Sequence, residues 1–505
     1  MSDGEVPTSK VARALAWSAA VAIVLSLLIM VVISVNGPSV SVPSLTHPAG
    51  GPPWWRSLHF RPSVVLLSLW AAAVLAAAGV AAGLVAVARG VRPPVRPLLA
   101  GVFLIIAVFT VLPPGGSTDT VSYAIDGNMV VAGHSPYVMT PNKFLATGGQ
   151  IARNSPVTWQ NSLSDYGPLA TASEWAAAEL GGNSMARITF WLKLWTSLAF
   201  GAVVLLLDRL LGRDPAARLR AHLLWSVNPL LLWEIVAGGH IDGVAIAFGV
   251  AGVAVLRAVR PGADSGSGRA LVSGLLIGAA IAVKSPFVLF ALGATLAVRR
   301  SLAAVAALAG GCLAVLAAAY MVAGRPAVSV LFNRGGQVTW DNLYQVFWRP
   351  LGYTTYHPAH LVIVATVLCV IVAIIVYLQL PSHVPWLPAV TPSLALSLAW
   401  IFTWPFQRPW YDVMIIALLV LYPASRLDWL VLIRLCFAAI TYMDAVPLPH
   451  GRLLSLQMLE GEWITSTVRL LALAALLWLC LAGRWGWRCR SAESGVTAPG
   501  LHVLT

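Results

Sequence analysis

The sequence predicts an all-α, polytopic membrane protein with about 14 (12–14) transmembrane helices, since a bilayer core about 30 Å thick needs roughly 20 apolar helical residues. Of the 505 residues, 58% are apolar and 10% are charged, and the mean hydropathy is +0.81. Soluble proteins carry roughly 25% charged residues, so an ordinary soluble fold is excluded. The candidate spans cover residues 11–35, 62–88, 97–113, 188–208, 221–238, 242–258, 270–284, 285–298, 302–323, 359–379, 389–405, 412–424, 428–444 and 466–483.

Two of these spans, 285–298 and 412–424, are short for a full crossing. Short segments of this kind can be broken or re-entrant helices that line a cavity. Lys284-Ser285-Pro286 breaks an apolar run directly before the first of them. We expect some of the candidate spans to be interrupted rather than continuous.

Clusters of arginine between the spans predict the orientation, because short cytoplasmic loops are rich in basic residues. If both termini are cytoplasmic, the clusters at 89–96, 209–220, 257–269, 299–300 and 484–490 all fall on the inner side. These anchors account for the net charge of +13, so no nucleic-acid partner is predicted.

The same orientation places the long loops 36–61, 114–187, 324–358 and 445–465 on the outer side. We therefore predict one integral domain over residues 1–505 of a multi-pass protein of the cell (plasma) membrane, with its active site on the outer, periplasmic face. The first outer loop, 114–187, is expected to be catalytic, and short helices in it to lie along the outer membrane surface. The second large outer loop is 324–358.

The first outer loop begins with a helix-like stretch, 117–127, in which Asp119, Tyr123 and Asp126 have the spacing i, i+4, i+7. Such residues share one face of a helix, so the two acids are expected to point into a cleft. An alternative is that Asp119 or Ser117 is an N-cap.

A second helix is predicted from Leu169 to Leu180, with Pro168 in its first turn and Asp165 as its cap. Gly181-Gly182 is expected to end it. Its aromatic residues, Tyr166 and Trp175, fit either membrane-interface anchors or binding groups.

Charged residues at the ends of the spans mark a second group of candidates, because ionisable groups in a membrane usually face a cavity. His240 and Asp242 follow the pair Gly238-Gly239, which permits a tight turn. They fit a role in orienting a hydroxyl, an incomplete metal site or a capped turn. The ammonium of Lys284 needs an anionic partner, either a ligand headgroup or a carboxylate such as Glu234.

Two further outer segments combine basic, amide and aromatic side chains that suit phosphate and sugar contacts. The loop 324–358 contributes Arg334, Gln337, Trp340 and Asn342, and the segment 404–412 contributes Arg408, Trp410 and Tyr411. The competing interpretations are a solvated arginine and an interfacial aromatic belt. The cysteines lie in apolar runs or in a basic tail and suggest neither disulfides nor zinc.

Several of these motifs occur together in one known group of enzymes. Asp119, Tyr123, Gly127, Gly133 and Pro136-Tyr137, directly after the third span, resemble the first outer loop of GT-C glycosyltransferases. The further motifs are Tyr166-Gly167-Pro168, Asn228-Pro229, Gly239-His240-Ile241-Asp242, Lys284 and Pro409-Trp410-Tyr411. With them the chain is most similar to the actinobacterial polyprenyl-phosphomannose-dependent α-(1→6)-mannosyltransferases of lipomannan and lipoarabinomannan assembly. The resemblance covers roughly 97–412, and Ile241 stands where Asn is expected.

The resemblance implies a GT-C-like helical bundle with a catalytic acid at Asp119, and Asp126 as the second candidate. A polyprenyl-phosphate sugar in the membrane lipid is the implied donor, and a glycan or lipoglycan is the acceptor. Arg408, Lys284 and Arg334 are the expected phosphate contacts. Tyr123, Tyr166, His240, Asp242, Gln337, Trp340, Asn342, Trp410 and Tyr411 are the expected substrate contacts.

A single displacement with Asp119 as general base would invert the anomeric centre, so a β-linked donor gives an α-(1→6) link. No cofactor or metal site is predicted, because no Asp-x-Asp pair occurs in the loop; a divalent ion stays open. The alternatives are another lipid-linked sugar such as arabinofuranose, another mannose linkage, or a flippase that moves a lipid-linked sugar. A transporter is expected to carry paired repeats and charges near the membrane midplane, whereas here the charges gather toward one face.

Overall fold

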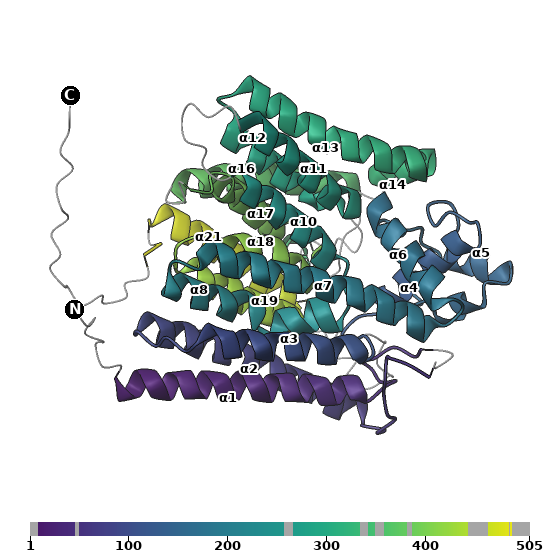
Figure 1. Cartoon of the computed structure of the whole chain (residues 1–505), viewed down its shortest axis with the longest axis horizontal. Helices are drawn as coiled ribbons and strands as arrows, with labels where there is room; N and C mark the ends of the chain where they lie inside the picture. The colour runs from purple at the N-terminus through teal and green to yellow at the C-terminus, as the bar shows by residue number, and fades with distance from the viewer. Residues whose placement is uncertain are drawn as a thin grey trace.

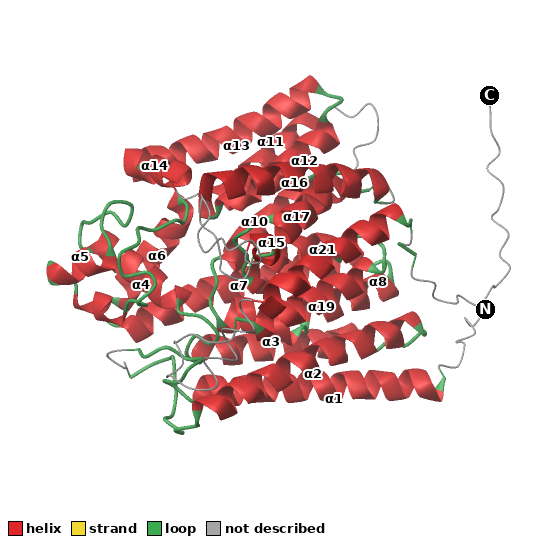
Figure 2. Ribbon diagram, turned by 180° about the vertical axis from the view of Figure 1, so that it is seen from behind, coloured by secondary structure: helices red, strands yellow, loops and turns green. Residues whose placement is uncertain are grey.

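The chain folds into a bundle of roughly parallel and antiparallel helices with a group of shorter helices at one end (Figure 1, Figure 2). The structure is a computed structural model that describes residues 9–45, 50–256, 266–333, 342–348, 358–380, 386–442, 463–483 and 485–486. Within those ranges the regular elements are all helices, which confirms the predicted all-α class.

The predicted spans coincide with helices along the whole described chain. Continuous helices are α1 (Lys10–Val35), α2 (Pro62–Ala88), α3 (Val95–Val111), α7 (Met185–Leu211), α10 (Asp242–Val255), α11 (Gly266–Val283), α12 (Val288–Val298), α13 (Leu302–Ala323), α16 (Pro358–Gln379), α17 (Val390–Thr403), α18 (Val413–Leu419), α19 (Leu427–Ile440) and α21 (Thr465–Leu481). The span predicted at 221–238 is assembled from α8 (Pro215–Ala221), η2 (His222–Ser226), α9 (Pro229–Leu231) and η3 (Leu232–Ala237).

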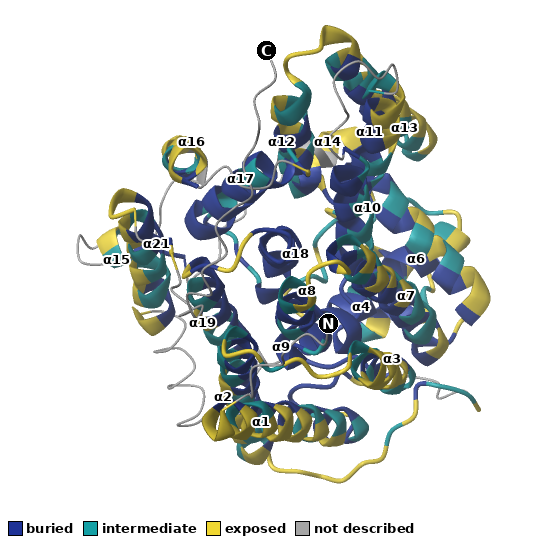
Figure 3. Ribbon diagram, turned by 60° about the vertical axis from the view of Figure 1, so that its left-hand side comes forward, coloured by how far each residue is buried: buried dark blue, intermediate teal, exposed yellow. Residues whose placement is uncertain are grey.

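Six helices are long and apolar enough to cross a membrane, and a bent pair raises the number to seven among the described residues. The six are α1, α2, α7, α11, α13 and the part of α16 from His360 to Gln379. The other apolar helices are shorter than this test requires, so the predicted total of about 14 crossings stays a prediction. Exposed faces of α1, α13 and α16 point outward and buried faces point inward (Figure 3). Because many of those exposed side chains are large and apolar, the surface suits lipid.

The bent pair joins 215–237 to α10 at an angle of 116°. Gly239 adopts φ +69° in the break, a conformation that glycine adopts without steric cost. The predicted tight turn after Gly238-Gly239 is therefore confirmed. Residues His240 and Asp242 consequently stand at a helix break, where the irregular backbone leaves side chains free to converge.

The first outer loop of the sequence analysis forms a small helical group, α4 (Asp119–Val131), α5 (Pro141–Ala146), η1 (Gln150–Asn154) and α6 (Pro168–Gly181). Both predicted helices are present, and Gly182 ends α6 with φ +59°. The predicted cap is wrong, because Gly167 is the N-cap residue of α6 and no side chain caps it. Asp165 lines a cavity instead.

Two glycines bring the elements of this group close together. A Cβ on Gly127 of α4 would lie 2.1 Å from the backbone oxygen of Glu174 in α6. A Cβ on Gly167 would lie 2.1 Å from the backbone oxygen of Ala282 at the end of α11. The N–H of Gly167 also donates to the carbonyl of Val283 at 3.0 Å. These approaches fix α4 against α6, and the start of α6 against the break that carries Lys284.

Gly127→Ala is expected to destabilise the protein by about 1–3 kcal/mol, because the new methyl group meets backbone that cannot turn aside. Gly101→Ala in α3 is the matched control, since a Cβ there meets nothing within 4 Å. The measurement is thermal unfolding of the two purified variants in the same detergent. Equal melting temperatures for both variants would show that the packing of α4 against α6 does not depend on the close approach at Gly127.

Candidate active site

A small cavity lies between the α4–α6 group and the segment 406–411. It is lined by Asp119, Ser122, Asp126, Pro141, Trp159, Ser162, Leu163, Ser164, Asp165, Tyr166, Phe406, Arg408, Trp410 and Tyr411. Asp119 and Asp126 reach it together, which confirms that their spacing puts both acids on one face of α4. Six of the predicted site residues (Asp119, Asp126, Tyr166, Arg408, Trp410 and Tyr411) thus meet at one cavity.

Asp119 is the first residue of α4 and is 8% exposed. Its backbone N–H donates to the Ser117 hydroxyl at 3.1 Å, and the phenol of Tyr123 donates to its carboxylate at 3.5 Å. Thr118 is the N-cap residue, so Asp119 is not a cap and its carboxylate is available to the cavity. Burial raises the pKa of Asp119, whereas the positive charges of Lys284 and Arg408 oppose the rise.

His240 and two tyrosines surround that carboxylate. His240 Nδ1 bonds to the backbone carbonyl of Glu234, so Nδ1 carries the hydrogen and Nε2 is the acceptor of a neutral ring. Nε2 lies 3.7 Å from Oδ2 of Asp119, and the ring stacks on Trp410 with 3.7 Å between centroids. The Tyr166 hydroxyl lies 3.1 Å from the Tyr123 hydroxyl and competes with Asp119 for its one hydrogen.

The ammonium of Lys284 pairs with Asp242 at 2.7 Å. Of the two partners considered for Lys284, the carboxylate is therefore present, but it is Asp242 and not Glu234. The same ammonium lies 4.3 Å from the ring centroid of Tyr411 and 5.5 Å from that of Tyr166. Two cavity-lining tyrosines therefore lie within cation–π range of this cation.

Arg408 is held against aromatic rings, with its guanidinium 4.8 Å from the centroid of Phe406 and 4.5 Å from that of Tyr442. The segment that carries it is fixed from α19, where Arg434 pairs with Asp412 and donates to the Gln407 side chain at 2.9 Å. Arg434 was not among the sequence candidates. A charge inside the apolar run 427–440 was the signal that could have found it.

Lys193 was missed in the same way, although it interrupts the apolar run of α7. Its ammonium is fully buried and donates to the carbonyls of Phe109, Leu112 and Pro113 at 2.5, 2.6 and 3.2 Å. Those carbonyls are at the end of α3, where the helix leaves its last acceptors unpaired. Lys193 thus fixes the point from which the chain runs to Asp119.

Three of the remaining predicted contacts cannot be compared with the cavity. Arg334, Gln337 and Trp340 lie outside the described residues. Asn342 is buried away from the cavity lining, and its amide oxygen accepts the N–H of Tyr344 at 3.0 Å. Trp175 is 44% exposed and donates to Glu179, so its place suits an interface anchor. Among the described residues no three His, Cys, Asp or Glu side chains gather as a metal site would require.

The fold and the cavity define a helical membrane protein that buries an acid beside cations at one end of its bundle. The chain belongs to the α-(1→6)-mannopyranosyltransferase family, whose N-terminal domain model matches residues 19–300. No solved structure matches the chain.

Three curated relatives carry the corresponding name. A probable α-(1→6)-mannopyranosyltransferase of Mycolicibacterium smegmatis is 28% identical over 28% of this chain and 25% of its own length. The α-(1→6)-mannopyranosyltransferase of Mycobacterium tuberculosis is 27% identical over 28% of this chain and 24% of its own. α-(1→6)-Mannopyranosyltransferase B of Corynebacterium glutamicum is 23% identical over 29% and 25%. The chain thus matches about a quarter of the length of these relatives.

Glu174 gives the site a stability test that does not depend on activity. It is fully buried in α6, and neither of its carboxyl oxygens has a hydrogen-bond partner in the described part of the chain. Burial, together with the nearby Asp126 and Asp165, raises its pKa well above the ordinary 4.5. The folded protein therefore holds a proton that the unfolded chain releases as the pH rises.

The stability contributed by protonated Glu174 is complete below about pH 4.5 and is lost as the pH rises toward its higher folded pKa. Glu174→Gln keeps the neutral form, so its melting temperature should exceed that of the wild type by more at pH 8 than at pH 5. Glu179→Gln, an exposed change on the same helix, should show no such pH-dependent difference. If the melting temperatures of Glu174→Gln and the wild type differed by the same amount at pH 5 and pH 8, the result would contradict a neutral Glu174 in the folded protein.

Proposed function

We propose that the protein is an inverting glycosyltransferase that moves mannose from a polyprenyl-phosphate donor to a mannan or lipoglycan acceptor. The product is an α-(1→6) link, and the reaction takes place on the outer face of the plasma membrane with both termini in the cytoplasm. The observation that carries the proposal is the convergence of Asp119 and Arg408 on one cavity, with Lys284 beside it, in a chain of the mannopyranosyltransferase family.

The basic groups suit the donor's phosphate. Arg408 lines the cavity, and its guanidinium can offer two N–H groups to one phosphate. Lys284, which pairs with Asp242 at 2.7 Å, adds a second positive charge beside the cavity in this proposal. As the bond between the anomeric carbon and the phosphate oxygen breaks, these charges stabilise the phosphate that leaves on its polyprenyl chain.

The acid suits the acceptor. The ionised carboxylate of Asp119 takes the proton of the acceptor hydroxyl while that oxygen bonds to the anomeric carbon. The neighbouring phenol of Tyr123 donates to the carboxylate and orients it toward the cavity. The stacked His240–Trp410 pair offers an aromatic wall for a sugar ring. A single displacement of this kind inverts the anomeric centre.

Orientation rests on the arginine clusters. The ends of α2 and α7 meet at one cavity that is lined by Arg92, Arg209 and Arg213, and it lies at the other end of the bundle from α4 and α6 (Figure 1). Basic residues mark the cytoplasmic side, so the site with Asp119 is assigned to the outer face.

Asp119→Asn should lower kcat for mannosyl transfer by about 10²–10⁴ and leave the melting temperature close to that of the wild type. The assay mixes purified protein with polyprenyl-phosphomannose and a short α-(1→6)-mannoside and detects the extended glycan. Glu179→Gln, an exposed acid of the same outer segment, is the matched control and should keep full activity. A fully active Asp119→Asn enzyme would contradict the role of Asp119 as general base. Movement of the lipid-linked sugar without a new glycosidic bond would favour a flippase.

Arg408→Gln should shift the acid limb of kcat/KM to higher pH. Arg408 lowers the pKa of Asp119, so its loss leaves the effect of burial less opposed and the carboxylate needs a higher pH to ionise. Arg153→Gln, an exposed change outside the cavity, should leave the limb in place. If the acid limb of Arg408→Gln stays at the wild-type pH, that limb does not report the ionisation of Asp119.

A further inference from the structure

A larger cavity, of about 1140 Å³, lies at the other end of the bundle from the candidate active site. It opens where α2 and α7 end, beside α8 and the turn between α18 and α19. Arg209 stands 16 residues beyond Lys193 on α7, which is about 24 Å of helix. The cavity is therefore separate from the one that contains Asp119, which lies by α4 and α6 at the other end of the bundle (Figure 1).

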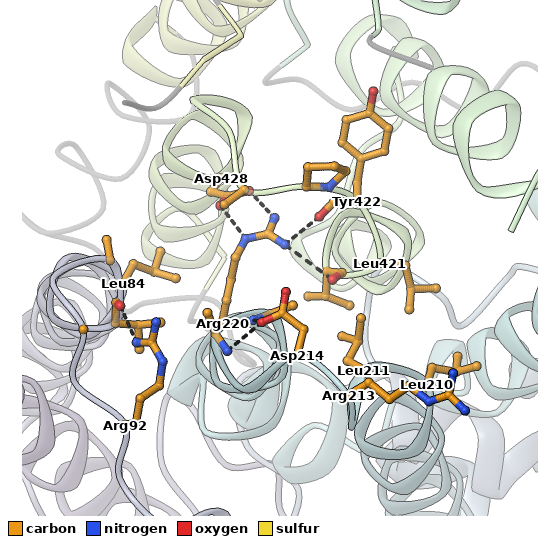
Figure 4. Close-up of a pocket in the computed structure, with 18 of the residues that line it drawn as sticks. Leu84, Arg92, Leu210, Leu211, Arg213, Asp214, Arg220, Leu421, Tyr422 and Asp428 are labelled. Atoms are coloured by element: carbon orange, nitrogen blue, oxygen red, sulfur yellow. Dashed lines mark hydrogen bonds and ion pairs between the residues drawn. The ribbon is translucent and has the colours of Figure 1, made fainter. Parts of the chain in front are cut away.

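A buried ion pair is part of the lining of this cavity. Arg220 of α8 donates to both carboxylate oxygens of Asp428 at 2.5 and 2.7 Å. It also donates to the carbonyl of Tyr422 at 2.7 Å (Figure 4). A further bond goes to the carbonyl of Leu419 at 3.1 Å. The guanidinium of Arg220 thus stabilises the end of α18, and its charge is balanced by Asp428.

The rim of the cavity is basic, and its arginine side chains are exposed. Arg92, Arg209 and Arg213 line the cavity and are exposed. Arg92 is oriented by donating to the carbonyls of Val87 and Val91 at 2.5 and 2.8 Å. The one acid on the described rim is Asp214, whose Oδ1 already accepts two N–H groups at the start of α8, at 2.9 and 3.0 Å. The described rim therefore carries an excess of positive charge.

The walls are apolar. Leu84 comes from α2, Leu210 and Leu211 come from α7, and Leu421 comes from the turn after α18 (Figure 4). Val87 of α2 also lines the cavity. Both α2 and α7 are long and apolar enough to cross a membrane, so a bilayer around them would place their ends near the phospholipid phosphates. Arginine side chains suit a phosphate at that depth, and apolar walls suit the start of an acyl chain.

We propose that this cavity binds an anionic phospholipid, with the phosphate on Arg92, Arg209 and Arg213 and the glycerol and upper acyl chains against the apolar walls. A free phosphate ester offers the same anion but leaves those walls without a partner. The size of the cavity also exceeds what a lone phosphate fills. This site is independent of the mannosyltransferase proposal, because none of its residues lines the cavity with Asp119.

The test titrates phosphatidylglycerol against the full-length protein in a zwitterionic detergent and measures binding by native mass spectrometry. Arg209→Gln/Arg213→Gln should weaken binding on the order of tenfold, since each basic group near a lipid headgroup contributes severalfold. Arg153→Gln/Arg187→Gln is the matched control, because it removes two exposed arginines from the opposite end of the bundle and should change binding less than twofold.

Two more ligands separate the possible sources of the phosphate. Phosphatidylcholine, which carries no net charge, should bind more weakly than phosphatidylglycerol and respond little to the two substitutions. Glycerol 3-phosphate should fail to compete with phosphatidylglycerol. Unchanged phosphatidylglycerol binding in Arg209→Gln/Arg213→Gln, or equal loss in the control variant, would overturn the site. Full competition by glycerol 3-phosphate would overturn its assignment to a lipid.

Discussion

The ion pair between Lys284 and Asp242 joins two helix breaks that lie beside the candidate active site. Asp242 begins α10 after the sharp bend at Gly238-Gly239, and Lys284 follows α11 at the Ser285-Pro286 break. Irregular backbone inside a membrane protein persists only where it is buried by protein or faces a cavity. The two breaks bring Lys284 and Asp242 together at 2.7 Å, and their pairing offsets part of the cost of burying each charge.

The other elements of the site depend on this junction. The start of α6 bonds to the carbonyl of Val283, directly before Lys284, so Tyr166 is brought to the ammonium. The α4 helix is fixed in turn by its close contact with α6 through Gly127. Lys193 fixes the other side of α4 by holding the end of α3. Asp119 is therefore positioned by buried polar contacts on both sides, which favours one defined placement of its carboxylate.

Much of the fold could be predicted, because apolar runs and the residues that interrupt them can be recognised from the local sequence. Pro168 and Gly181-Gly182 bound α6, and Lys284-Ser285-Pro286 interrupts the run where η4 (Ser285–Phe287) separates α11 from α12. The shared face of Asp119 and Asp126 likewise follows from helical spacing. Partners across the bundle could not be predicted in the same way. The local sequence does not show that Lys284 pairs with Asp242 rather than with Glu234. It also does not show that Arg434 donates a hydrogen bond to the side chain of Gln407.

The two cavities differ in how their charges are balanced, and the difference suits different chemistry. At the cavity that contains Asp119 an acid stands beside cations, so burial raises the pKa of its carboxyl group and the positive charges lower it. At the opposite end the buried arginine is already matched by Asp428, and the cations of the rim face no equivalent acid in the described structure. The first arrangement fits proton transfer to a group that must gain and lose charge. The second fits steady attraction of an anion, which requires no titration at all.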